Sequence, residues 1–184
     1  MKREFPIDDE WLPFEIHPDT PPEGVRWADY FPGMDPEGFF RQLDVRGKPM
    51  GIRFGPQSLM SNSRQAMEGG EFAKIHGRYE AYHAAIFKAF FTDCRDIGSR
   101  EVLLDIAQTV GLDRQAFAAV LDSRTHVSRL ADTTRRARGG GITSAPTFLI
   151  DGYGTITGAQ PLGTFRTALR ELEQGVSGGW IHAL

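Results

Sequence analysis

Few residues in this chain are suited to chemistry, and the first to consider is its only cysteine. Cys94 follows Phe90-Phe91-Thr92-Asp93 and precedes Arg95, at the expected C-terminal end of a helix. A helix C-terminus carries partial negative charge and disfavours a thiolate, although Arg95 opposes this effect. One thiol cannot form a disulfide within its own chain, so we expect no redox role for Cys94.

The five histidines do not form a metal-ligand pattern. His83 lies in an apolar helical stretch, where a packed imidazole is a simpler interpretation than a catalytic one. The remaining four share no metal-ligand spacing and are His17, His76, His126 and His182. Structural zinc sites need clusters of cysteine and histidine, which this sequence lacks, so we predict no metal site.

The most informative feature is a proline at the start of a β-type run. Pro146 follows a glycine- and arginine-rich helix end and opens the apolar run Thr147–Ile150. Proline has no N–H to donate to a sheet ladder, so it fits the first residue of a strand or an edge position. Ser144 and Ala145 precede it directly.

Two other segments place polar residues before expected helices. Asn62 or Ser63 is predicted to cap a helix, because asparagine and serine are favoured at that position. Residues 158–161 are predicted to form a strand-to-helix turn, and the helix N-terminus after it would attract a carboxylate. The residues alone explain both segments as a cap and a turn.

In their order along the chain, these segments resemble the DsbA-like family of the thioredoxin superfamily. The resemblance rests on Trp11-Leu12-Pro13-Phe14-Glu15-Ile16, Ser61-Asn62-Ser63-Arg64, Ser144-Ala145-Pro146 and Ile156-Thr157-Gly158-Ala159-Gln160-Pro161. The nearest branch is similar to the FrnE-type dithiol oxidoreductases and the 2-hydroxychromene-2-carboxylate isomerases. In that family the reactive Cys-x-x-Cys or serine lies in a strand and helix ahead of the Trp11 segment, and this sequence does not contain them.

The resemblance implies an active-site wall at Ser144, Ala145 and Pro146, with a cis bond before the proline. Backbone groups ahead of a cis-proline face outward, where an extended peptide or glutathione can pair with them. The other residues implied to bind this substrate or glutathione are Asn62, Ser63, Trp11, Pro13, Gly158 and Gln160. The resemblance assigns no certain catalytic residue to this chain. Glutathione is the one small molecule that it suggests, and no other cofactor is expected.

Hydrophobic periodicity and capping signals predict a strand, a long helical region, a hairpin and a final helix. The first strand is expected over residues 7–16, restricted to a sheet edge by Pro13. Helices are predicted over 35–47, from 62 or 63, over 78–92 and 99–110, from 113, and over 125–138. Strands at 147–150 and 155–158 then flank a turn, and a helix follows at 161–174. The 78–92 helix has its apolar face formed by Tyr79, Tyr82, Ile86, Phe87 and Phe90.

We therefore predict an α/β fold, a thioredoxin-like (DsbA-like) sheet that is truncated at its N-terminus and carries a large inserted helical domain. Residues 1–20 and 143–184 are assigned to the thioredoxin-like part, and residues 21–142 to the insertion. Three predicted strands are fewer than the four that this frame needs. Since an unpaired strand edge invites association, we expect a homodimer, unless the remaining strands close directly on each other.

Three functions are compatible with this sequence. The first is a DsbA/FrnE-family thiol-disulfide oxidoreductase-like protein without dithiol activity as given, because the Cys-x-x-Cys segment is absent. The second is a glutathione-dependent relative of 2-hydroxychromene-2-carboxylate isomerase, and the third is a non-catalytic binding or assembly module. A Cys-x-x-Cys or a serine encoded upstream of Met1 would discriminate between the first two.

The resemblance implies a thiol-containing peptide or a glutathione-like small molecule as the partner, and composition argues against other classes of partner. The net charge is −3 and the basic residues are scattered, so nucleic acid is not expected as a partner. No apolar run approaches the ~18 residues of a membrane span. The first six residues lack the apolar core of a secretory signal, and we expect a cytoplasmic protein.

Overall fold

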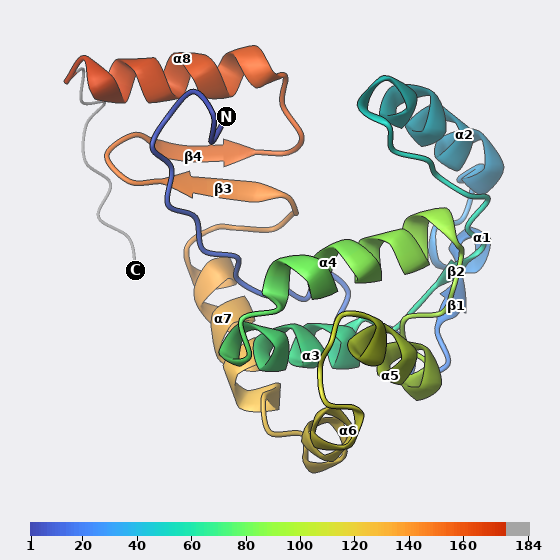
Figure 1. Ribbon diagram of the computed structural model, residues 1–184. Helices are drawn as coiled ribbons and strands as arrows, with labels where there is room; N and C mark the ends of the chain where they lie inside the picture. Colours follow the sequence, from blue (N-terminus) through green and yellow to red (C-terminus); the bar gives the residue numbers. More distant parts are fainter. Residues whose placement is uncertain (176–184) are drawn as a thin grey trace. The chain divides into compact units, whose positions relative to one another are not determined.

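The computed structural model describes residues 1–175 and divides the chain into two compact units (Figure 1). His17–Leu130 form one unit, called here the helical unit. Met1–Ile16 and Ala131–Leu184 form the other, called here the hairpin unit, of which residues 176–184 lie outside the described part. The second segment of the hairpin unit thus begins at Ala131, whereas the corresponding part of the thioredoxin-like domain is predicted to begin at residue 143.

The helical unit follows the predicted order of helices. Its elements are β1 (Val25–Arg26), α1 (Trp27–Tyr30), α2 (Pro36–Gly47), a 3-10 turn (Lys48–Met50), β2 (Leu59–Met60), α3 (Arg64–Ile75), α4 (Tyr79–Phe87), a π-helical segment (Lys88–Thr92), α5 (Arg100–Thr109), α6 (Arg114–Ser123) and the start of α7 (Val127–Gly139). β1 and β2 form a short antiparallel pair.

Capping residues explain where two of these helices begin. Asp35 Oδ1 accepts a hydrogen bond of 3.0 Å from Gly38 N–H at the start of α2, with Pro36 at its first position. Asp113 Oδ1 accepts one of 2.7 Å from Ala116 N–H at the start of α6. Gly111, just past the end of α5, has the left-handed φ of +79° that favours glycine there. The helices predicted over 35–47 and from 113 are therefore confirmed.

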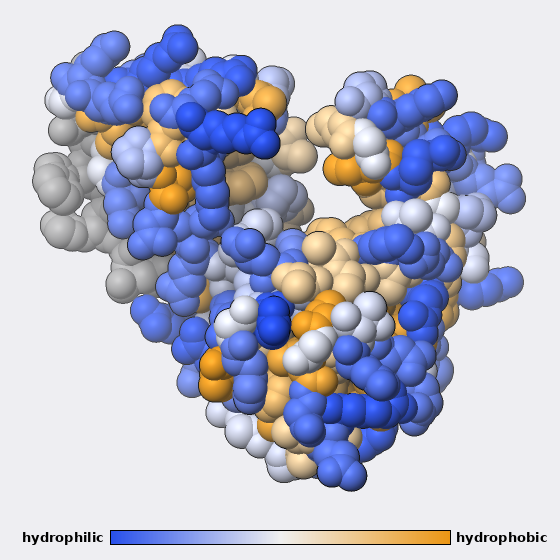
Figure 2. Space-filling view, in the orientation of Figure 1, coloured by the Kyte–Doolittle hydropathy of each residue, from blue (hydrophilic) through white to orange (hydrophobic). Residues whose placement is uncertain are grey.

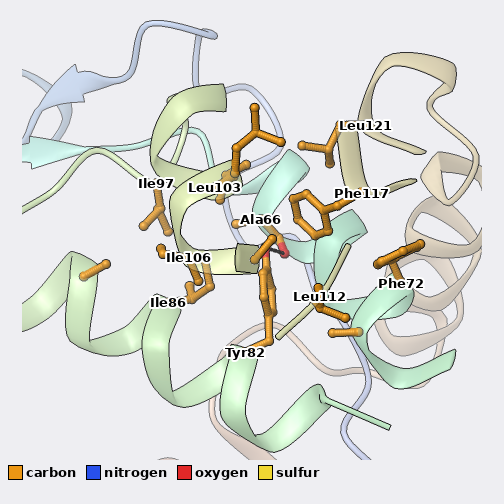
Figure 3. Close-up of a cluster of buried hydrophobic side chains, with 14 of the residues drawn as sticks. Ala66, Phe72, Tyr82, Ile86, Ile97, Leu103, Ile106, Leu112, Phe117 and Leu121 are labelled. Carbon is orange, nitrogen blue, oxygen red and sulfur yellow. Dashed lines mark hydrogen bonds between the residues drawn. The ribbon is translucent and has the colours of Figure 1, made fainter. Parts of the chain in front are cut away.

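A cluster of buried apolar side chains holds α3, α4, α5 and α6 together (Figure 3). Phe117, Leu103 and Leu121 are completely buried, and each such side chain contributes roughly 1.5–3 kcal/mol relative to an exposed position. Tyr82 also lies in this core, and its hydroxyl donates a 3.1 Å hydrogen bond to the carbonyl oxygen of Ala66. The buried phenol therefore keeps a polar partner.

The predicted apolar face of the 78–92 helix is wrong at one position. Tyr82, Ile86 and Phe90 are buried at successive four-residue steps, but Phe87 is 50% exposed. Phe87 lies about 100° round the helix from Ile86, and the chain then widens into the π-helical segment. Apolar surface is visible over α4 in Figure 2, on a face that is otherwise largely hydrophilic.

In the hairpin unit, β3 (Thr147–Ile150) and β4 (Gly154–Thr157) pair antiparallel, with Thr147 opposite Thr157 and Ile150 opposite Gly154. α8 (Leu162–Glu173) follows, and the rings of Phe148 and Phe165 meet edge to face at 4.8 Å. The predicted hairpin and final helix are therefore confirmed.

The predicted strand at residues 7–16 is wrong, because the described structure assigns no strand there. The backbone groups of Glu15 in this segment instead form hydrogen bonds with side chains of α7. Glu15 N–H donates to Thr134 Oγ1 at 3.1 Å, and Arg138 Nη2 donates to the carbonyl oxygen of Glu15 at 3.1 Å. Side-chain partners on a helix satisfy these groups without the ladder that defines a strand. Within residues 1–175, the sheets are the two antiparallel pairs β1–β2 and β3–β4.

Candidate functional site: the loop at Pro146

The loop that enters β3 carries the three residues predicted to form the active-site wall. The Ala145–Pro146 peptide bond is cis, the isomer that the family resemblance implies. The carbonyl oxygen of Pro146 accepts a 2.7 Å hydrogen bond from Gly158 N–H, and Thr147 Oγ1 donates a 2.7 Å bond to the carbonyl oxygen of Ser144. These two bonds fix the backbone on both sides of Ala145.

Ala145 itself is exposed, and so is Pro146. In the part of the chain that the structure describes, neither the N–H nor the C=O of Ala145 takes part in a backbone hydrogen bond. An N–H and a C=O that are held in place and open to solvent offer the pairing that an extended backbone needs. The loop can therefore bind a peptide-like ligand through main-chain hydrogen bonds.

The turn from β4 into α8 lies beside this loop through the Gly158–Pro146 bond. Gly158 has a φ of +82°, a left-handed conformation that glycine adopts without strain. Gln160 Nε2 donates back to the carbonyl oxygen of Thr157 at 2.9 Å, so the Gln160 side chain packs on its own turn. Thus the structure brings together the predicted residues Ser144, Ala145, Pro146, Gly158 and Gln160.

Trp11 and Pro13 lie in the N-terminal segment of the same unit. The Trp11 indole is 47% exposed, and its Nε1–H donates to Asp9 Oδ2 at 3.2 Å. The hydrogen bonds given above tie the end of this segment to α7 rather than to the loop at Pro146. A binding role for Trp11 and Pro13 therefore stays a prediction.

Asn62 and Ser63 belong to the helical unit, where Asn62 has a clear structural role. Its Oδ1 accepts a 3.1 Å bond from Arg64 N–H at the first residue of α3, and its Nδ2 donates to the carbonyl oxygen of Thr20 at 2.6 Å. Ser63 occupies the N-cap position, and its hydroxyl makes no capping bond. Asn62 thus satisfies the helix start, and contact of either residue with a ligand stays a prediction.

The family now follows from comparison with known proteins. The model of the DSBA-like thioredoxin domain matches residues 10–170. The chain belongs to this family. A protein of Bacillus subtilis (strain 168) named YwbO, whose function is uncharacterized, is 30% identical over 173 residues, covering 90% of this chain and 82% of YwbO.

Two solved structures share the fold of this DSBA-like chain. A probable DsbA oxidoreductase from Streptomyces coelicolor, SCO1869, superposes with a TM-score of 0.79 at 24% identity, covering 92% of this chain and 76% of that one. A 2-hydroxychromene-2-carboxylate isomerase gives a TM-score of 0.65 at 18% identity, covering 96% and 88%. The predicted family and the α/β, DsbA-like fold with its helical insertion are therefore confirmed.

The one thiol of this DSBA-like chain, Cys94, belongs to the helical unit, whereas Pro146 belongs to the hairpin unit. Burial and then the charge of Asp93 raise the pKa of Cys94, so the thiolate is disfavoured. Arg95 does not offset this, because its guanidinium pairs with Asp105 at 3.1 Å. Cys94 is therefore a poor nucleophile at neutral pH.

Titratable groups elsewhere do not build a metal centre in the described residues, where no cluster of three or more histidine, cysteine or carboxylate side chains could hold an ion. Burial lowers the pKa of His83, which favours its neutral form. No helix within residues 1–175 combines the length and the apolar character that a bilayer span requires.

Sequence reasoning missed two buried carboxylates on α3, Glu68 and Glu71, which are 0% and 5% exposed. Nothing local distinguishes them, because isolated glutamates are ordinarily solvated. A usable signal was the run Glu68-Gly69-Gly70-Glu71, which places two acids one helical turn apart around two residues without side chains.

Proposed function

We propose that this DSBA-like protein binds the extended backbone of a thiol-containing peptide, or of glutathione, along the loop at Ala145 and Pro146. The observation that carries this proposal is the exposed Ala145, whose N–H and C=O are open while its neighbours are fixed by bonds from Thr147 and Gly158. Main-chain pairing at such a loop recognises a peptide with little dependence on its side chains. The N-terminal turn of α8 offers a favourable place for the ligand's carboxylate.

Titration with S-methylglutathione tests this binding, because the methyl group blocks thiol chemistry and leaves the backbone intact. We expect saturable NMR shifts at the amides of Ala145 and Thr147. Ala145→Pro removes the N–H donor and should weaken binding roughly two- to tenfold, whereas Ala145→Ser should not. Unchanged shifts at Thr157 in both variants would show that the hairpin is intact. Absence of any saturable shift at millimolar ligand would refute the proposal.

As a chain with one cysteine, the protein is proposed to act as an oxidoreductase-like binder without dithiol activity. Thiol-disulfide exchange by a Cys-x-x-Cys protein needs a second thiol to release the mixed disulfide, and Cys94 has no partner in the chain. We expect insulin reduction at the background rate, with no difference between the wild type and Cys94→Ser. Turnover above background that survives Cys94→Ser would contradict this prediction.

The second candidate function is a glutathione-dependent isomerase or transferase-like activity. It is favoured by the same lone, poorly reactive thiol, because in that chemistry the ligand supplies the sulfur. A thiol-dependent change of a chromene or related substrate that requires added glutathione would support it. A purely non-catalytic binding module would instead bind S-methylglutathione and turn over neither substrate.

We also propose a homodimer in the cytoplasm. Phe148 and Leu149 on β3 are apolar and 38% and 53% exposed, and symmetric pairing is the commonest way in which soluble proteins bury such surface. Light scattering at micromolar concentration should give the mass of two chains. A well-folded monomer of 20.5 kDa would overturn the dimer and leave the binding proposal untouched.

A further inference from the structure

Two buried carboxylates on α3 hold the connection between α6 and α7 through arginines. Glu68 is completely buried, and its Oε1 lies 2.8 Å from Arg124 Nη2. One turn further along, Glu71 Oε2 pairs with Arg129 Nε, and Glu71 Oε1 accepts a 2.9 Å bond from Lys74. Arg124 follows α6 directly, and Arg129 lies in the first turn of α7. Both ends of the connection are thus tied to one helix.

Two backbone hydrogen bonds of this connection are long, whereas the Val127 N–H lies 3.2 Å from the carbonyl oxygen of Arg124. Arg124 has a φ of +54°, which an arginine adopts at a cost, and its N–H lies 3.4 Å from the carbonyl oxygen of Leu121. The Thr125 N–H lies 3.4 Å from the carbonyl oxygen of Val120. Both distances exceed the usual range of about 2.7–3.2 Å. The ion pair with Glu68 therefore adds to the bonds that keep Arg124 in this conformation.

Among the charged groups near Glu68, Arg124 forms a direct ion pair with it. Arg64 on α3 and His126 in the connection add positive charge at longer range. From α4 and α6, Tyr82 and Phe117 pack against the adjacent Gly69 and bring no charge. α5 also packs on α3, and its charged residues Arg100, Glu101 and Asp105 are engaged in exposed ion pairs with Asp122, Arg114 and Arg95.

We propose that Glu68 and Arg124 form a proton-operated latch, which holds the α6–α7 connection on α3 while Glu68 is ionised and releases it when Glu68 takes up a proton. An ionised, buried carboxylate needs a cation beside it. A protonated carboxyl does not, and Arg124, whose side chain is 42% exposed, can then turn to water.

The charges and the burial around Glu68 favour release of Arg124 as the pH falls. Burial raises the pKa of Glu68, opposed in part by Arg124, His126 and Arg64, so protonation occurs closer to neutral pH than for an exposed glutamate. For Glu71, burial also acts to raise the pKa, but the bonds from Lys74 and Arg129 outweigh it and the pKa is lowered. On acidification Glu68 therefore takes its proton first, while Glu71 keeps Arg129.

Hydrogen exchange of the full chain tests the latch at the amides of Thr125, Val127 and Leu130, whose N–H groups bond within the connection. After correction for intrinsic exchange, we expect their protection to fall about tenfold or more as the pH is lowered from 8 through the titration of Glu68, since a bond between charged groups is lost. Glu68→Gln should show the low protection at every pH. Asp122→Asn, which removes an exposed carboxylate of α6, should behave as wild type.

Two further variants keep the test decisive. His126→Gln should retain the loss of hydrogen-exchange protection at low pH. If this loss disappears in His126→Gln and persists in Glu68→Gln, the histidine is the switch and the proposal fails. Unchanged protection of Leu103–Ala107 in α5 would show that Glu68→Gln is folded. If it does not fold, Arg124→Gln should give the same low, pH-independent protection. Wild-type protection in either folded latch variant would overturn the proposal.

Discussion

Gly69→Ala should lower the free energy of unfolding by about 1–3 kcal/mol, although alanine is the better helix former. A Cβ at Gly69 would collide with Tyr82 Oη and with the Phe117 ring, both of which are buried and cannot move aside freely. Helix propensity alone would favour alanine by about 0.8–1 kcal/mol, which is too little to offset this overpacking. Urea unfolding followed by circular dichroism measures the difference.

Gly70→Ala is the matched control on the same helix. The nearest atom to a Cβ there is Tyr79 Cε2 at 3.5 Å, an ordinary contact. We expect this variant to be more stable than wild type by about 0.5–1 kcal/mol, since alanine reduces the entropy of the unfolded chain. If both substitutions stabilise, the close packing of α3 against Tyr82 and Phe117 is not as described.

Glu71→Gln should destabilise the fold by about 2–3 kcal/mol at pH 7, because it weakens two charge-assisted hydrogen bonds in a poorly solvated place. The pKa of Glu71 is lowered in the folded state, so its stabilisation is present above its unfolded pKa and is lost as the pH falls through the folded one. The difference from wild type should therefore be full at pH 7 and shrink below about pH 4.5.

An exposed ion pair provides the comparison for Glu71. Arg26 and Asp29 form a bidentate pair whose side chains are 74% and 50% exposed, so Asp29→Asn should cost much less than Glu71→Gln. Unfolding free energies of both variants at pH 7 and pH 4 complete the test. A cost for Glu71→Gln as small as that of Asp29→Asn would show that the α3–α7 pair does not stabilise the protein.

Local signals made much of the fold predictable. The caps of α2, α5 and α6 lie within about four residues of the helix ends that they stabilise. Asp35 and Asp113 cap helix N-termini, and Gly111 follows the end of α5. The loop at Pro146 was found in the same way, because a proline before a β-branched and aromatic run has few compatible positions. The family resemblance then supplied the expectation for its neighbours Gly158 and Gln160.

Features that depend on distant partners were not predictable. Residues 7–16 were predicted to form a strand, but the backbone hydrogen bonds of Glu15 go to Thr134 and Arg138, which local sequence does not reveal. Glu71 is separated from Arg129 by 58 residues, so the local sequence around either residue does not indicate a buried ion pair. Helix propensity disfavours a glycine at position 69, whereas the close approach of Tyr82 and Phe117 requires it.

The hairpin unit is formed by two separate stretches of chain, which are synthesised at different times. Glu4 and Arg166 pair at 2.8 Å although 162 residues separate them, and Glu15 bonds to Thr134 across 119. At about 5–20 residues per second, roughly eight to thirty seconds pass between the synthesis of Glu4 and that of Arg166. The helical unit, which is one continuous stretch, emerges whole during that interval. Residues 1–16 therefore leave the ribosome before the helical unit does and acquire their native partners after it.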